Sequence, residues 1–485
     1  MSFTPKYYEN YKFYLLACLL IGTLIRLYGL NIQSLWLDEL YTIVYSSSGI
    51  PSLWEHIIID VHPPLYPVFM FYWFKIFGTS DISARLPSAI AGVLSLLAMY
   101  HYSKKVFGQY VSTSATILLS LTYAGVYYSQ EARSYSFLIL LSIVSTFSFM
   151  KIVSNEKTSV RDYIIYTIVC ILIAYVHYFG LLLIEFQFIY LFLNAAFHNK
   201  QEFLKVVLIQ FLLLISYIPW INVMINTLNK NGGGKFWIQK PGLLLIAQFF
   251  GLVIYPGVIS ILIAFVFLMI IPLALDYEKF KSNLLSTLKA MNLKSPLFIL
   301  FYLAIGTLIA GFIISQSTPI LTARNLLTLS PIIYILISVW VSMCSKLSGY
   351  KQNAYILTIC IVCFALVSPQ FYSPNKEQWR ESINYAVENS DNQTTFVTLG
   401  YTDYYKYYFD QIEIPKNSVI INKGDKDNIT NIYTQMIDLH KNKLIILGAH
   451  KHKLTENEQN FLESKSKSHE VKEFVLSVVY IYTFD

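Results

Sequence analysis

Charged side chains are scarce in this sequence: Asp, Glu, Lys and Arg together make up only 13% of its 485 residues. A soluble protein of this length needs far more charge to cover its surface. Hydrophobic residues make up 55% of the chain, and its mean hydropathy is +0.50. Repeated apolar runs are long enough to cross a bilayer. The composition therefore excludes a soluble globular protein and predicts a polytopic α-helical membrane protein.

Cysteine is also rare, and the chain contains no internal repeat and no low-complexity tract. The cysteines are Cys18, Cys170, Cys344, Cys360 and Cys363, and all lie in apolar runs. Cys360 and Cys363 have C-x-x-C spacing, but they fall inside a predicted membrane helix. We therefore interpret all of them as packing residues and not as a redox or zinc pair.

The apolar runs predict about 11–13 transmembrane helices. Leu65–Phe77 and 243–254 are short at about 1.5 Å per residue, and we expect both to lie at the interface. Arg26, near the end of the first run, is expected to extend toward the interface. The segments expected to cross are 13–30, 85–103, 110–127, 135–150, 163–178, 180–196, 203–223, 256–275, 296–314, 326–344 and 353–368.

The loop charges predict the orientation of these helices. With a cytoplasmic N-terminus, most lysines fall in inner loops, as the positive-inside rule requires. The formal charge of +7 thus reflects topology and does not indicate a nucleic-acid partner. We expect a multi-pass protein of the plasma or inner membrane, with its distinctive polar residues on the outer face. The outer loops hold only Lys75, Arg133, Lys230, Lys235, Lys240 and Arg324.

The composition changes near Pro369, which divides the chain into a membrane domain, 1–369, and a C-terminal domain, 370–485. The second part is charged and has no spanning run. Its sequence predicts a small extracytoplasmic α/β domain with a three-layer or doubly wound sheet. The expected strands are 395–399, 418–421, 443–447 and 471–483, and the expected helices include 376–389 and 428–440.

The first outer loop, 31–64, carries two motifs with chemical potential. Asp38 and Glu39 follow Trp36, and a partly shielded carboxylate could act as a general base toward a hydroxyl group. The alternative is a helix cap on an outer loop. In the turn Asp60-Val61-His62-Pro63-Pro64, proline holds the preceding residues extended, so His62 has a fixed direction. It could donate to a phosphate or orient an acid, or be incidental to a proline-rich helix entry.

Glu131 and Arg133 flank the entry to a helix that starts near Tyr135, and Arg324 is the single charge of another outer segment. The planar guanidinium group matches phosphate oxygens, so both arginines are candidates for a lipid-phosphate clamp. The alternative is that they only mark the interface.

His177 and Tyr178 end a predicted span on the outer side, where they are either aromatic-belt anchors or part of a cleft. Glu185 lies about two turns deeper in the next span. It is either functional or neutral and bonded to a neighbouring helix.

With these motifs, the chain resembles the GT-C membrane glycosyltransferases that use polyprenyl-phosphate sugars, especially protein O-mannosyltransferases and the aminoarabinose transferase of lipid A. The resemblance rests on Asp38-Glu39, on the turn from Asp60 to Pro64 and on the segment from Glu131 to Tyr135. It extends over about residues 10–370 in organisation.

The resemblance implies an inverting hexosyl- or pentosyltransferase. Asp38 would be the catalytic base and Glu39 its support, while His62, Arg133 and Arg324 would hold the donor phosphate. Some relatives bind a divalent metal near the acidic loop, but this sequence does not fix a ligand set, so metal dependence stays open. The β-trefoil insertion of eukaryotic protein-mannosylating members has no counterpart here. The missing insertion argues against a protein acceptor, and a lipid or glycan hydroxyl is an equally possible acceptor.

Other classes of function predict different features. A lipid or saccharide transporter predicts polar residues near the middle of the membrane and an inverted repeat. A non-catalytic cell-envelope assembly protein predicts that the C-terminal domain carries the function. The outer clustering of the polar residues favours the transferase.

Overall fold

The computed structural model describes residues 10–154, 158–198, 200–231, 238–242, 244–424 and 427–485. The chain forms two compact units. The helical unit comprises Met1–Tyr28, Ile50–Tyr72 and Arg85–Pro369. The C-terminal unit comprises Gly29–Gly49, Trp73–Ala84 and Gln370–Asp485, so it includes Asp38 and Glu39 of the first loop as well as the expected α/β segment.

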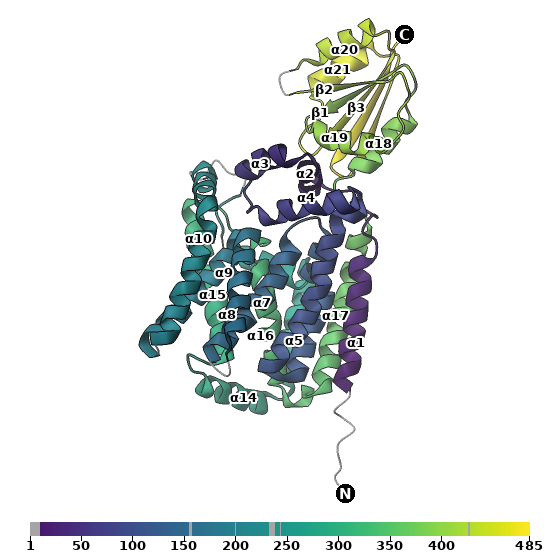
Figure 1. Cartoon of the computed structure of the whole chain (residues 1–485). Coiled ribbons are helices and arrows are strands. Elements are labelled where there is room, and N and C mark those ends of the chain that lie inside the picture. The colour runs from purple at the N-terminus through teal and green to yellow at the C-terminus, as the bar shows by residue number, and fades with distance from the viewer. Residues whose placement is uncertain (1–9, 155–157, 199, 232–237, 243, 425–426) are drawn as a thin grey trace. The chain divides into compact units, whose positions relative to one another are not determined.

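The helical unit is a bundle of long helices that run alongside one another (Figure 1). Apolar side chains dominate each helix, and lipid requires that a spanning segment satisfy its own backbone hydrogen bonds. The amphipathic helix α14 (Tyr277–Ala290) lies across one end of the bundle (Figure 1). The long helices are α1 (Asn10–Leu27), α5 (Asp81–Leu121), α7 (Tyr135–Ser154), α8 (Val160–Val176), α9 (Tyr178–His198), α10 (Lys200–Asn231), α15 (Pro296–Ser317), α16 (Ser330–Ser342) and α17 (Tyr350–Tyr372).

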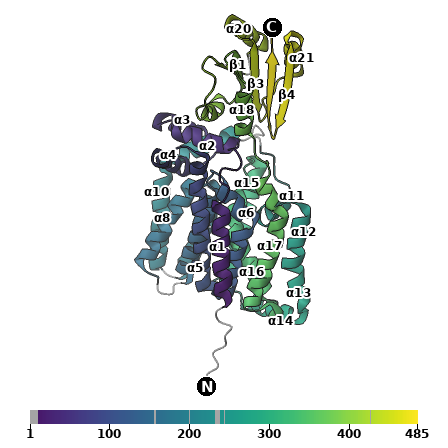
Figure 2. The same ribbon diagram turned by 90° about the vertical axis from the view of Figure 1, so that its right-hand side faces the viewer.

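Shorter helical elements complete this unit. The helices α12 and α13 lie along one side of the bundle (Figure 2), and α3 and α4 run crosswise in Figure 1. These elements are α3 (Ile50–Ile59), α4 (Leu65–Phe77), α6 (Tyr123–Tyr127), η2 (Tyr128–Gln130), α11 (Leu244–Val253), α12 (Val258–Phe265), η3 (Val266–Ile270), α13 (Ile271–Leu275), η4 (Asn325–Leu329) and η5 (Ser345–Leu347).

The expected apolar spans coincide with helices in the described part of the chain. The helix α5 covers one whole span and much of the next, and its backbone is broken at Gly108, where φ is 77°. Five helices among the described residues are long and apolar enough to cross a membrane, or six if a bent pair counts as one span. The protein is therefore a multi-pass membrane protein. The crossing of the other expected spans and the interfacial placement of α4 and α11 stay predictions.

Arg26 does not extend to an interface as expected; its side chain is fully buried in the bundle. Its guanidinium group donates to the carbonyl oxygens of Gly22 and Ser120, both at 2.9 Å, and of Leu119 at 2.8 Å. The last two oxygens belong to the end of α5, where carbonyl groups lack partners within the helix. A Cβ atom at Gly92 or Gly125 would lie 3.0 or 3.1 Å from this guanidinium group, so both glycines provide its space.

The C-terminal unit contains a five-stranded sheet in the order β2-β1-β3-β5-β4. The strands β1, β2 and β3 are parallel, and β5 is antiparallel to both β3 and β4. The small α/β domain expected from the sequence is thus confirmed, although the segment 471–483 forms parts of two strands. The strands are β1 (Thr394–Leu399), β2 (Val419–Lys423), β3 (Lys443–Ala449), β4 (Ser468–Phe474) and β5 (Ser477–Thr483).

Helices cover both faces of this sheet. Side chains of α20 (Ile429–Asp438) and α21 (Glu456–Lys465) share one buried cluster with the strands. The helices α18 (Trp379–Glu388) and α19 (Thr402–Phe409) pack on the strands elsewhere, as the edge-to-face contact of Phe396 with Phe409 shows. The helix α2 (Leu37–Ser47) of the first loop packs on α19.

Replacement of Arg26 by Met is expected to lower the stability of the protein by about 2–4 kcal/mol, because buried carbonyl groups would lose charged donors that no water replaces. The apparent unfolding temperature in detergent measures this loss. Leu24→Met is the control, since Leu24 is 58% exposed on the same helix. Equal unfolding temperatures for the two variants would contradict the role of Arg26.

Candidate functional site

The residues singled out in the sequence fall into both compact units. Asp38 and Glu39 belong to the C-terminal unit. The others belong to the helical unit: Asp60, His62, Glu131, Arg133, Tyr135, His177, Tyr178 and Arg324.

In the helical unit, the turn after α3 brings Asp60, His62 and Arg133 into contact. The Oδ1 atom of Asp60 accepts from the backbone N–H of Val61 at 2.7 Å and lies 3.3 Å from Nδ1 of His62. One terminal nitrogen of Arg133 lies 3.4 Å from Nδ1 and 3.3 Å from Nε2 of the same ring. His62 therefore lies between a carboxylate and a guanidinium group.

The electrostatics of this turn favour the ionised form of Asp60. Burial alone would raise the pKa of Asp60, but the charge and hydrogen bond of His62, together with the charge of Arg133, outweigh burial. The net effect is a pKa below the ordinary value of 3.8.

A row of aromatic rings connects this turn with the other candidates of the helical unit. The ring centroid of His177 is 6.1 Å from that of His62 and 6.0 Å from that of Tyr135. The Tyr135 ring in turn lies 4.9 Å from Tyr128. Sequence reasoning did not single out Tyr128.

Tyr128 also interacts electrostatically with the remaining charged candidates. Burial raises the pKa of Tyr128 well above its ordinary value; nearby Glu131 and Tyr135 add to the rise, and Arg324 opposes it. The charges of Glu131 and Arg324 therefore both act on the buried Tyr128 hydroxyl group. At Tyr178, the hydroxyl group accepts a hydrogen bond from the indole N–H of Trp220 at 3.2 Å.

Backbone contacts fix the segment that carries Arg133. The hydroxyl group of Ser88 donates to the Arg133 carbonyl at 3.0 Å. The side-chain amide of Gln130 donates to the carbonyls of Ile25 and Tyr28, at 2.7 and 2.8 Å, and so caps the end of α1. Arg26 of α1 caps the end of α5 in return. The segment that leads from the end of α5 to Arg133 is therefore anchored at both of its ends.

In the C-terminal unit, the adjacent carboxylates of α2 have different surroundings. Glu39 is fully buried, and its Oε2 atom lies 3.1 Å from Nζ of Lys376, which is also buried. The same oxygen accepts from the backbone N–H of Trp36 at 3.4 Å. Asp38 is partly exposed in the first turn of the helix. Glu39 thus has a structural partner, while Asp38 reaches the surface of its unit.

A second carboxylate, Glu377, holds the backbone before α2. It accepts from the N–H of Leu37 at 2.9 Å and from the indole of Trp379 at 2.8 Å, and it lies 2.7 Å from Nδ1 of His450. The hydroxyl group of Ser34 donates to the Glu377 carbonyl at 2.6 Å. Sequence reasoning missed Lys376 and Glu377, because no local pattern pairs residues about 340 positions apart.

Glu185, an alternative candidate in the bundle, lies 3.4 Å from the side-chain amide of Gln210 on α10. Its neighbour therefore belongs to another helix, as the structural alternative predicted. All five cysteines are free and buried, as the packing interpretation predicted.

Within the described ranges, no group of three or more His, Cys, Asp or Glu side chains has the spacing of a metal site. A metal near the acidic loop stays a prediction from the resemblance.

The fold is that of the GT-C membrane glycosyltransferases, which confirms the resemblance seen in the sequence. The chain is similar to crystal structures of ArnT from Cupriavidus metallidurans, in the apo state and bound to undecaprenyl phosphate. The TM-scores are 0.61 and 0.60 at 12% identity; 97% and 98% of this chain are covered, and 98% of ArnT in each case. The dolichyl-phosphate-mannose-protein mannosyltransferase family model matches residues 61–220. No curated protein sequence shows significant similarity to the chain.

Replacement of Asp60 by Asn is expected to change the acid dependence of stability. Because the folded-state pKa of Asp60 is lowered, its ionised form stabilises the fold above pH 3.8, and this contribution is lost as the pH falls through the folded pKa. The variant should be less stable near neutral pH and lose less stability below pH 3.8. Unfolding temperatures measured against pH test this, with exposed Glu55→Gln on α3 as the control.

Proposed function

We propose that this protein is an inverting glycosyltransferase that moves a sugar from a polyprenyl-phosphate donor to a hydroxyl group of a lipid, glycan or protein acceptor. The family model that matches residues 61–220 describes a dolichyl-phosphate-mannose-protein mannosyltransferase, and one ArnT structure contains undecaprenyl phosphate. The matched region contains His62, Arg133, His177 and Tyr178.

The observation that carries the proposal is the contact of Arg133 with His62 and, through His62, with Asp60. The donor phosphate gains negative charge as its bond to the sugar breaks, so catalysis needs donors already held in place. Arg133 supplies a planar set of N–H donors for phosphate oxygens. Asp60 orients His62. The hydrogen bonds of Ser88 and Gln130 hold the backbone of the Arg133 segment in place.

Asp38 is the base in this proposal. Its carboxylate accepts the proton of the acceptor hydroxyl while that oxygen attacks the anomeric carbon from the face opposite the phosphate. The bond between the anomeric carbon and the phosphate oxygen breaks, and its electron pair leaves with the polyprenyl phosphate. One bond forms and one breaks, and the configuration at the anomeric carbon inverts because the attack comes from the face opposite the leaving phosphate.

The adjacent carboxylates Glu39 and Asp38 have different roles in this proposal. Glu39 is engaged by Lys376 and by the backbone of Trp36, so it holds the first turn of α2. Asp38, partly exposed beside it, keeps a surface position from which it could meet a substrate. In the proposed reaction, Asp38 acts on the acceptor hydroxyl and the Arg133 cluster acts on the donor phosphate, on the outer side of the membrane, with the N-terminus in the cytoplasm.

Asp38→Asn is expected to reduce sugar transfer by about 10²–10⁴-fold, the range that general-base catalysis contributes. The assay is transfer from a polyprenyl-phosphate sugar in membranes or nanodiscs, with donor binding measured in parallel and expected to be unchanged. Asp410→Asn is the matched control, since Asp410 is exposed in the same unit. Undiminished turnover in a folded Asp38→Asn protein would remove the base assignment and with it this proposal.

Arg133→Gln is expected to weaken binding of polyprenyl phosphate by about 10–100-fold, because hydrogen bonds to a charged group contribute about 1.5–3 kcal/mol. Titration with undecaprenyl phosphate in detergent measures this affinity. Arg161→Gln serves as control, because Arg161 is exposed at the start of α8. A stronger effect on the acceptor KM than on donor affinity would contradict the clamp.

A further inference from the structure

The order of the parallel strands creates a topological switch point in the C-terminal unit. The chain leaves β1 for β2 on one side and then passes to β3 on the other side of β1. In open α/β sheets, ligands bind in the crevice outside the carboxyl ends of the strands at such a point. Here this position is defined by the residues that follow β1 and β3, namely Gly400, Tyr401, His450 and His452.

The backbone at this position has unusual geometry. Gly400 and Tyr401 follow β1 with φ angles of 61° and 44°, and His450 follows β3 with a φ of 56°. Residues other than glycine seldom adopt positive φ, and they cluster at functional sites. The ring of His452 lies where a Cβ atom of residue 400 would be, at 2.9 Å, so only glycine permits this packing. The backbone conformation at these strand ends therefore accommodates the two histidines.

His450 has a defined hydrogen-bonding state at this edge. Its Nδ1 atom lies 2.7 Å from Oε1 of Glu377, whose side chain is only 4% exposed. A carboxylate partner places the proton on Nδ1, which leaves Nε2 to accept a hydrogen bond when the ring is neutral. The His450 side chain is 30% exposed, so a hydroxyl group from a ligand can reach it.

Aromatic rings continue from these strand ends to the helix that carries Asp38. Tyr401 stacks on Tyr404 with centroids 5.4 Å apart, and its ring meets the rings of both histidines. Tyr404 contacts Tyr45, and Tyr45 contacts Tyr41. Positions 38, 41 and 45 share one face of α2, since they are three and seven residues apart. The row of rings therefore runs from the strand ends to the α2 face of Asp38 within one compact unit.

The loop after β3 is also cationic. Lys451 and Lys453 alternate with the two histidines, and both lysines are exposed. Neither lysine has an ion-pair partner among the described residues. A ligand with stackable C–H faces, hydroxyl groups and a negative charge matches these rings, the His450 ring nitrogen and the lysines together.

We propose that the surface formed at these strand ends by Gly400, Tyr401, His450 and His452, here called the strand-end site, is the acceptor site, and that the acceptor is an anionic saccharide. This inference rests on the proposed transferase function for the identity of its ligand as acceptor. It gives the C-terminal unit a role: it binds the hydroxyl-bearing substrate beside the helix that carries the base.

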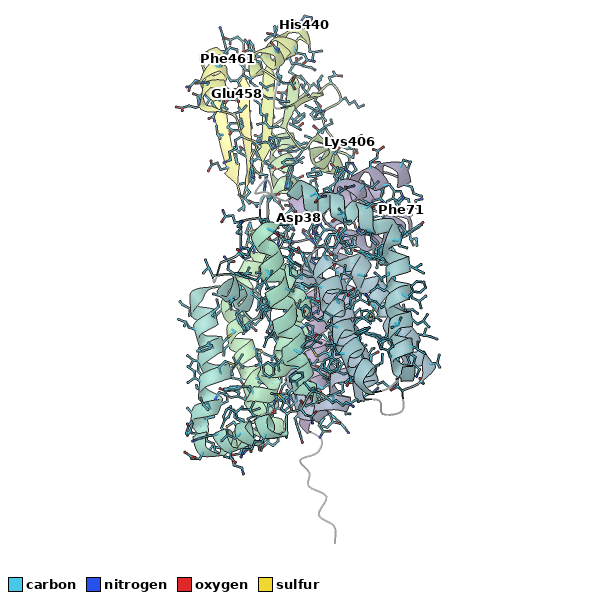
Figure 3. The ribbon with its side chains drawn as sticks, turned by 90° about the vertical axis from the view of Figure 1, so that its left-hand side faces the viewer. Asp38, Phe71, Lys406, His440, Glu458 and Phe461 are labelled. Carbon is cyan, nitrogen blue, oxygen red and sulfur yellow. The ribbon has the colours of Figure 1, made fainter. Side chains whose placement is uncertain are left out.

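His440 provides a matched control within the same unit. It has a φ of 55°, close to the 56° of His450, and it precedes β3, whereas His450 follows it. The two histidines therefore lie at opposite ends of β3, and His440 and Asp38 lie at opposite ends of the unit (Figure 3). Asparagine tolerates positive φ, so His→Asn replaces the imidazole and leaves the backbone state accessible.

The test titrates the full chain, in phosphatidylcholine nanodiscs, with glucose 6-phosphate, glucose or inorganic phosphate, followed by saturation-transfer NMR. Glucose 6-phosphate should bind about 10-fold more tightly than the other two, since it alone engages both rings and lysines. His450→Asn and Tyr401→Asn should each weaken it by about 5-fold or more, and His440→Asn should not. Binding should persist in Arg133→Gln, which distinguishes the strand-end site from the donor clamp.

Equal binding by wild type and by both strand-end variants would overturn the proposal, and so would the absence of any binding to the wild type. Inorganic phosphate that binds as tightly as the sugar phosphate would show an anion site only and also overturn it. Failure of the transferase function gives a different result: the sugar phosphate still binds at the strand-end site, but no sugar is transferred in the wild type.

Discussion

The buried carboxylate of Glu377 is the constraint on which the proposed chemistry of the C-terminal unit depends. A buried charge is costly unless donors surround it, and the backbone N–H of Leu37, the Trp379 indole and the His450 ring all point at this group. Satisfying Glu377 therefore fixes the start of α2, the end of β3 and the core under α18 at the same time. The loop that carries Asp38 owes its position to a residue at the beginning of the α/β segment, not to its own sequence.

The helical unit also buries a charged side chain, in this case a positive one. The guanidinium group of Arg26 is removed from water, and backbone carbonyls at the end of α5 accept its hydrogen bonds in place of a carboxylate. Gln130 returns the contact by capping α1. Helix ends inside a bundle leave carbonyl groups without partners, and these two side chains supply the missing donors. The reciprocal caps flank the segment before Arg133. The hydrogen bonds that satisfy the backbone carbonyl groups therefore also hold this candidate phosphate-binding residue in a fixed position.

The sequence predicted what local patterns determine. Apolar runs located the helices, alternating segments located most strands, and His62 and Arg133 were singled out from proline geometry and loop charge before their contact was known. It could not predict Lys376 and Glu377, whose partners Glu39 and Leu37 are about 340 positions away, because no periodicity encodes such pairs. Arg26 was misread for the same reason: its burial depends on the glycines of α5 and α6, not on its place near a helix end.

Adjacent acids with different surroundings are how a fold assigns different tasks to chemically equal groups. Glu39 and Asp38 are neighbours in the chain, but one turn of α2 directs them to different environments. Glu39 meets Lys376 in a buried pair, and the loss of either partner would leave an uncompensated charge. That requirement makes Glu39 unsuited to accept a substrate proton, since a protonated Glu39 would leave Lys376 buried without an opposite charge. Asp38 is therefore the carboxylate of the pair that the proposed mechanism uses as its base, while the buried ion pair keeps its neighbour in a structural role.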